Sequence, residues 1–167
     1  MNHRVRQLAF FAAVAGIGIV AACDDDDPSG PTVVRTNFAA TLSGANERPT
    51  AITTTATGNA IVTVFGTDSV TYRVQVASID SVIASHIHAG DATCVCPVMF
   101  GFAAFTSPTS IGALTTLREG TIVRTSTFNG SYTFDSLLTR LNNGTAYVNV
   151  HTRRNPIGEI RGPLIKQ

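Results

Sequence analysis

Apolar residues at every second position are the feature that most constrains the fold of this chain. The clearest run is Val70–Val76, in which apolar residues alternate with Thr, Arg and Gln. Successive side chains of a strand point to opposite faces of a sheet, so this run predicts a strand with one buried face. We predict further strands at Thr36–Ser43, Gly58–Phe65, Ile83–Ala89 and Gly120–Phe128, and a hairpin over Tyr147–Leu164.

One segment has a different period. Between Thr133 and Gly144, Phe and Leu residues recur at three- and four-residue spacing before an Asn-Gly stop signal, which predicts one short helix. A Ser-, Thr- and Pro-rich loop is predicted from Phe105 to about Thr116, after a cysteine-containing stretch. Short strands at regular spacing, separated by Gly and Pro turns, indicate an all-β fold: an antiparallel β-sandwich with one short helix.

The N-terminus predicts export and a lipid anchor. Arg4 and Arg6 precede an apolar run over Leu8–Val20, which is the pattern of a secretory signal peptide. The sequence Val20-Ala-Ala-Cys23 resembles the bacterial lipobox, in which the Cys becomes the lipidated first residue of the mature protein. The alternative is a plain signal peptide with a chance Cys. We expect lipidation of Cys23 and anchoring to a bacterial membrane, in the periplasm or at the cell surface.

This reading divides the chain into three parts: a signal peptide (1–22), a flexible acidic tether (23–35) and a folded domain (36–167). The whole chain has 12 basic and 11 acidic residues. Removal of the signal peptide takes away Arg4 and Arg6 and leaves 10 basic and 11 acidic residues. Clustered Lys and Arg are lacking, so we expect no nucleic-acid partner.

His86 and His88 are two residues apart on a predicted strand, so both imidazoles lie on one face. With His151 from the terminal hairpin they could form a three-nitrogen site for zinc or copper. Alternatively, the histidines bond loop backbone, Glu47 or Glu159 and hold one end of the sandwich together. From the sequence alone we favour this structural role.

Cys94 and Cys96 are the thiols left after acylation of Cys23. In an exported protein such a pair is oxidised or metal-bound. On a regular strand the two Cα atoms would be too far apart for a disulfide, so a Cys94–Cys96 disulfide requires a local turn, which Pro97 favours. The alternatives are unrelated thiols, or a thiolate pair that joins the histidines to bind Cu⁺.

Glu159 and Arg161 lie on one face of the last strand, and with Glu47 they form a candidate structural polar cluster. We expect an ion pair between Glu159 and Arg161 that closes the terminal hairpin. General acid/base chemistry beside His151 is the alternative. The sequence contains no recognisable catalytic motif, so we expect a protein that is not an enzyme.

Four segments together resemble the CHRD domain, which is named for chordin and is common in bacterial secreted proteins. They are Phe38–Pro49, the Gly58 strand, His86-Ile-His88, and Tyr147–Thr152 with Asn155–Gly162. The resemblance implies an immunoglobulin-like β-sandwich without established catalytic activity, and the His-x-His strand also resembles the copper strand of copper/zinc superoxide dismutase. We therefore expect a binding or adhesion module with an envelope or extracellular protein partner. The alternative is a copper- or zinc-binding module.

Overall fold

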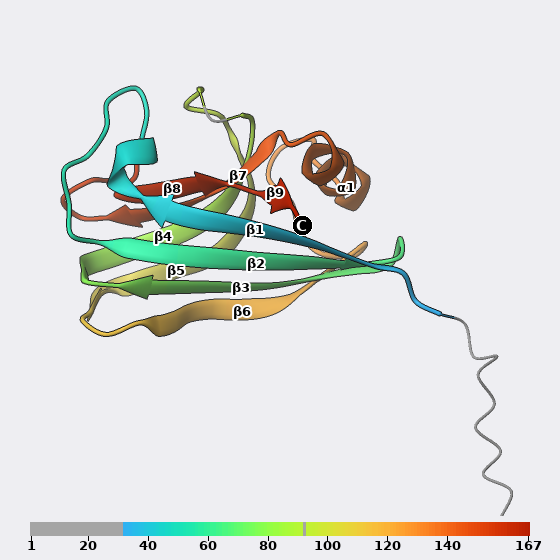
Figure 1. Ribbon diagram of the computed structural model, residues 1–167, viewed down its shortest axis with the longest axis horizontal. Coiled ribbons are helices and arrows are strands. Elements are labelled where there is room, and N and C mark those ends of the chain that lie inside the picture. Colours follow the sequence, from blue (N-terminus) through green and yellow to red (C-terminus); the bar gives the residue numbers. More distant parts are fainter. Residues whose placement is uncertain (1–31, 92) are drawn as a thin grey trace, which may run out of the picture. The chain divides into compact units, whose positions relative to one another are not determined.

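The computed structural model describes residues 32–91 and 93–167, which contain nine strands and one α-helix (Figure 1). In chain order the elements are β1 (Arg35–Ser43), a 3-10 turn (Gly44–Asn46), β2 (Thr57–Phe65), β3 (Ser69–Ala77), β4 (Ile79–Ala89), β5 (Val98–Ile111), β6 (Thr115–Val123), α1 (Phe134–Asn142), β7 (Ala146–Thr152), β8 (Ile160–Pro163) and β9 (Ile165–Lys166).

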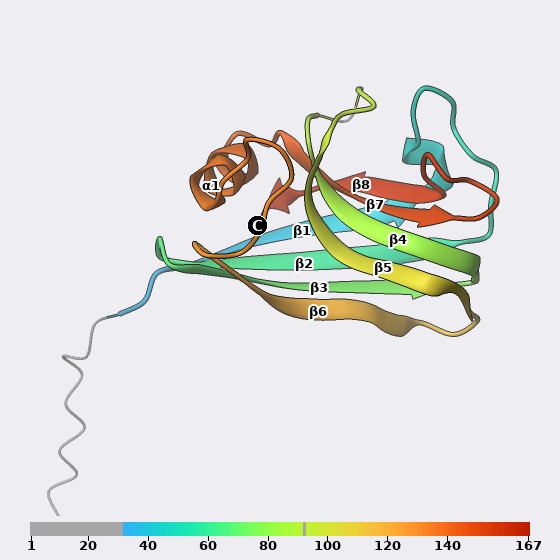
Figure 2. The ribbon, with the colours of Figure 1, turned by 180° about the vertical axis from the view of Figure 1, so that it is seen from behind.

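All nine strands belong to one antiparallel sheet that folds over on itself. Its order is β5-β4-β7-β8-β1-β2-β3-β6, with β9 paired to β1. Figures 1 and 2, seen from opposite sides, show β1, β2, β3 and β6 as one layer and β4, β5 and β7 in the other. Tyr72 on β3 stacks on Phe102 of β5, with ring centroids 4.3 Å apart, so the two layers meet near the ends of the sheet. The predicted all-β sandwich with one short helix is confirmed.

The core lies between the layers and consists of the apolar positions of the alternating runs. These side chains are almost fully buried: Phe38, Leu42, Val62, Val74, Ile87, Met99, Ile122, Val148, Val150 and Ile160. Each apolar side chain of this size contributes roughly 1.5–3 kcal/mol by leaving water. Burial of one face of each strand therefore sets the register of the whole sheet.

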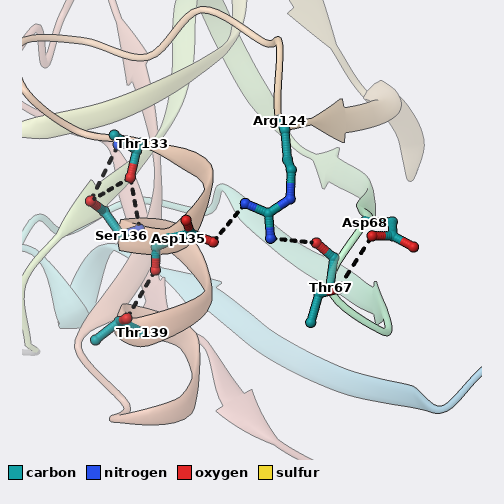
Figure 3. Close-up of polar contacts among 7 residues, drawn as sticks. All are labelled: Thr67, Asp68, Arg124, Thr133, Asp135, Ser136 and Thr139. Atoms are coloured by element: carbon teal, nitrogen blue, oxygen red, sulfur yellow. Dashed lines mark hydrogen bonds and ion pairs between the residues drawn. The ribbon is translucent and has the colours of Figure 1, made fainter.

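The helix α1 begins at a capping box and covers one end of the core. The Thr133 hydroxyl accepts from the Ser136 amide, and the Ser136 hydroxyl accepts from the Thr133 amide (Figure 3). Arg124 donates to Asp135 over 2.9 Å and to the Thr67 carbonyl over 3.0 Å, which ties the helix to the β2–β3 turn. The predicted helix is confirmed, and its buried side includes Leu137 and Leu141.

Two predicted boundaries between residues 105 and 128 are wrong. The expected loop from Phe105 is the second half of β5, which runs to Ile111, and the expected strand Gly120–Phe128 is β6, which ends at Val123. β5 is an end strand that pairs only with β4, through an irregular register. An end strand tolerates exposed Ser and Thr, and also Pro108, because one of its sides needs no hydrogen bonds.

The predicted signal peptide (1–22), Cys23 and most of the predicted tether (23–35) lie outside the described residues. Within residues 32–91 and 93–167, no helix is long and apolar enough to cross a membrane.

Candidate metal centre

The pairing of β4 with β7 brings the three predicted histidines together. His86 and His88 lie on β4, and the register places Tyr147 opposite His88 and Asn149 opposite His86. His151, two residues further along β7, shares their face of the sheet. One ring nitrogen from each histidine lies within 4.8 Å of the other two. His86 Nδ1 is 3.0 Å from His151 Nε2.

The outer face of this strand pair is polar but buried, because loops cover it. Every residue of β7 is buried, although its side chains alternate between the apolar core and the histidine face. The covering loops include residues 93–97 and 153–159, which contact the histidine face through the backbone carbonyls of Cys96 and Pro156. His88 and His151 are only 6% and 7% exposed, while His86 is partly exposed.

Backbone carbonyls hold two of the imidazoles by the same ring atom. His88 Nδ1 donates to the Cys96 carbonyl over 2.7 Å, and His151 Nδ1 donates to the Pro156 carbonyl over 3.1 Å. A carbonyl only accepts, so this pattern assigns the proton of each ring to Nδ1 and leaves Nε2 unprotonated. Histidines that bind a metal ion through Nε2 commonly donate Nδ1–H to a backbone carbonyl in this way.

The other ring nitrogen of His88, Nε2, is not held in this way. This atom is buried and makes no hydrogen bond within the described part of the chain. His151 Nε2 accepts from His86 Nδ1, an interaction that a metal ion would replace. A buried polar atom without a hydrogen bond lowers the stability of the fold by about 1–3 kcal/mol. A ligand that binds this nitrogen would remove the penalty.

Burial keeps the three imidazoles neutral. It lowers the pKa of His86 and of His88 to about 4, and the neighbouring imidazoles add to the effect. Burial also lowers the pKa of His151. Neutral imidazole is the metal-binding form, so protons do not compete with a metal ion near pH 7.

The disulfide loop packs over His88. Cys94 and Cys96 form a disulfide in the loop before β5, with Cα atoms 5.3 Å apart. The Tyr147 hydroxyl accepts from the Cys96 amide over 3.1 Å, and the Tyr147 ring stacks on His88, with centroids 4.7 Å apart and planes 9° apart. The Cys96 carbonyl and the Tyr147 ring together fix the orientation of His88.

Arg161 does not form the ion pair expected with Glu159. Its guanidinium lies 4.0 Å from the centre of the Tyr147 ring and donates to the carbonyls of Cys94 and Asp91 over 2.8 and 3.2 Å. The expectation was wrong because loop carbonyls approach the buried guanidinium. In the described residues the ion pair that is present joins Arg124 to Asp135.

Glu159 and Glu47 lie in different surroundings. Glu159 accepts hydrogen bonds from Thr54, Thr152 and Asn155. Burial alone would raise the pKa of Glu159, but these hydrogen bonds have the larger combined effect, so the pKa is lowered. Burial raises the pKa of Glu47 from 4.5 to about 7, against the opposing charge of Arg161. Glu47 Oε1 has no hydrogen-bond partner among the described residues.

Two further residues of this face were not among the candidate site residues, although the period of two places them on the side of His151. Asn149 lies opposite His86 and donates weakly to Glu47 Oε2 at 3.5 Å and to the Ile157 carbonyl at 3.4 Å. Tyr147 stacks on His88. Both alternate with Val148 and Val150 in the same strand as His151, and this period-two pattern is the signal that places them on the histidine face.

Comparison with known proteins identifies one family. The family model described as CHRD domain matches residues 38–164, and it confirms the resemblance found in the sequence. Neither the curated proteins nor the solved structures give a significant match.

Proposed function

The chain belongs to the CHRD domain family, and from this premise we propose that it is a non-enzymatic binding module of the bacterial cell envelope. We propose further that it binds a transition-metal ion through His86, His88 and His151. The single observation that carries this function is the buried, unpaired Nε2 of His88 beside two other imidazole nitrogens.

The donor set suits zinc or copper. Imidazole nitrogen is a preferred ligand of both metals, and three histidines leave an open position for water or another ligand. Metal–nitrogen bonds of about 2.0–2.1 Å require nitrogens about 3.3–3.5 Å apart. The present spacing of up to 4.8 Å closes to this value by small ring movements, which the partly exposed His86 can make most easily.

Metal content of the full-length protein tests the proposal. The protein is loaded with zinc or copper, dialysed, and measured by inductively coupled plasma mass spectrometry; one ion per chain is expected. His86→Ala should abolish retention, because it removes one of the three ligands. We choose this position because backbone carbonyls hold the other two imidazoles, whereas His86 bonds to His151. Arg73→Ala, an exposed position on β3, serves as the matched control. Circular dichroism verifies folding, and equal retention by wild type, His86→Ala and His151→Ala overturns the proposal.

Membrane anchoring through Cys23 is the second part of the proposal, and the N-terminal pattern supports it. Cys23→Ser should move the protein from the membrane fraction to the soluble fraction after cell lysis. A variant that remains in the membrane fraction would contradict a lipid anchor at this residue.

Adhesion to a protein partner is a second candidate function, and two exposed apolar side chains favour it. Val95 is 60% exposed on the disulfide loop, and Ile157 is 63% exposed on the loop that holds His151. Apolar residues that gather on an exposed surface mark interaction sites, so we propose these two loops as the contact surface. Val95→Asp with Ile157→Asp should reduce attachment of cells that carry the protein, with Leu114→Asp, an exposed residue near β6, as the control.

A further inference from the structure

The three-histidine centre has no negative ligand. Imidazole is neutral, and within the described residues neither a carboxylate nor a thiolate lies within the cluster. Cys94 and Cys96, the nearest sulfur atoms along the chain, are joined in a disulfide and carry no charge. A bound ion therefore keeps its whole charge in the site.

A buried cation lies close to the same centre. Arg161 is 2% exposed, and its guanidinium covers the Tyr147 ring that stacks on His88. His88 occupies one face of this ring at 4.7 Å, so the guanidinium at 4.0 Å lies over the other face. The bonds from Arg161 to the carbonyls of Asp91 and Cys94 bring no compensating negative charge.

The buried acids nearby bond to groups other than the three histidines. Glu159 faces Thr54, Thr152 and Asn155. Glu47 contacts Asn149, and burial raises the pKa of its carboxyl to about 7, so the carboxyl is largely neutral in mildly acidic solution. Among the charged groups of the described residues, Arg161 is therefore the one whose contacts lead to His88, through the Tyr147 ring.

Such surroundings discriminate by ionic charge. The desolvation free energy of an ion rises with the square of its charge. Entry into this site is therefore much less favourable for a divalent ion than for a monovalent ion. Repulsion by Arg161 adds to this cost. The 4.7 Å between the His88 and Tyr147 rings and the 4.0 Å from the Tyr147 ring to the guanidinium place Arg161 roughly 9 Å from the His88 ring. At this distance, in an effective dielectric of about 20, one extra unit charge is disfavoured about twentyfold.

From this arrangement we propose that the centre selects monovalent copper, Cu⁺, over Zn²⁺ and Cu²⁺. Three neutral nitrogen donors satisfy Cu⁺ in trigonal coordination, and the three donor atoms lie within 4.8 Å of one another. This inference rests on the proposed metal-binding function and specifies its ion.

Chelator competition on the full-length protein tests the selectivity. Cu⁺ is competed with bicinchoninate under anaerobic conditions, with ascorbate rather than a thiol as reductant so that the disulfide stays intact. Zn²⁺ and Cu²⁺ are competed with colorimetric chelators at the same pH. We expect one Cu⁺ per chain, with a Kd at least about twentyfold below those of Zn²⁺ and Cu²⁺, and loss of this binding in His86→Ala.

An isosteric change tests the charge argument itself. Asn149→Asp adds a carboxyl group on the histidine face, opposite His86 in the sheet, while Asn149→Ser removes the amide without adding charge. The aspartate variant should tighten Zn²⁺ binding at least about tenfold more than Cu⁺ binding, and the serine variant should leave their ratio unchanged.

The outcomes separate the two proposals. Absence of any retained ion overturns both the metal-binding function and the selectivity. Tightest binding of Zn²⁺ or Cu²⁺, lost in His86→Ala, supports the metal-binding function and overturns the preference for Cu⁺. Tightest binding of Cu⁺ with an unchanged ratio in Asn149→Asp overturns the charge mechanism.

Discussion

Replacement of Glu47 by Gln should change how the stability of this protein depends on pH. In the folded protein burial raises the pKa of Glu47 from 4.5 to about 7. Between these values the folded state holds a proton that the unfolded state has lost. Glu47 therefore contributes stability that is complete below pH 4.5 and is lost as the pH rises through about 7.

The magnitude follows from the difference between the two pKa values. A rise of the Glu47 pKa from 4.5 to about 7 corresponds to roughly 3 kcal/mol in the free energy of unfolding, at about 1.4 kcal/mol per pKa unit. Water penetration and relaxation around a buried carboxylate reduce such values, so we expect about 1–2 kcal/mol. Glutamine resembles the protonated acid at every pH, so Glu47→Gln should gain this amount relative to wild type between pH 5 and pH 8.

Urea denaturation of metal-free protein at pH 5, 6, 7 and 8 measures the difference. The three histidines act in the opposite sense, because their lowered pKa values contribute stability that is lost as the pH falls from 6.5 toward 4. The histidines are present in both wild type and Glu47→Gln, so their contribution cancels in the difference between the two free energies of unfolding. Glu119→Gln, at an exposed position on β6, is the matched control. A difference between Glu47→Gln and wild type that stays constant from pH 5 to pH 8 would refute the reasoning.

Three further predictions concern stability and are checked by the same urea denaturation at pH 7. Thr133→Ala removes the capping box of α1 and should cost about 1 kcal/mol, with little change in the sheet. Phe38→Ala leaves a cavity at a fully buried site and should cost about 3–5 kcal/mol. Gly162→Ala should destabilise strongly, because a Cβ there would lie 2.2 Å from the Thr41 carbonyl oxygen, whereas Gly112→Ala, which meets nothing within 4 Å, should fold normally. A cost for Gly162→Ala no larger than that of Gly112→Ala would contradict the close approach of β8 to β1.

The predictions made from local patterns agree well with the structure. The alternation over Val70–Val76 specifies β3, because one buried face imposes a period of two whatever the strand pairs with. The three- and four-residue spacing after Thr133 specifies α1 in the same way. The pattern failed over Phe105–Ile111, where Ser, Thr and Pro on an end strand of the sheet look like a loop.

Local sequence patterns predicted one part of the candidate site, and only the tertiary structure shows the rest. His86 and His88 share a face because they are two residues apart on one strand, and the sequence alone determines this much about them. The approach of His151 depends on the register of β7 against β4, a pairing between residues 57 to 70 positions apart that no local pattern encodes. Loops that come together only in the folded chain decided three further features of the site. These are the covering of the polar face, the His88 Nε2 that lacks a partner among the described residues, and the bonding of Arg161 to carbonyls. Burial and charge depend on what surrounds a residue in three dimensions, so only the tertiary structure turned three histidines into a candidate metal centre.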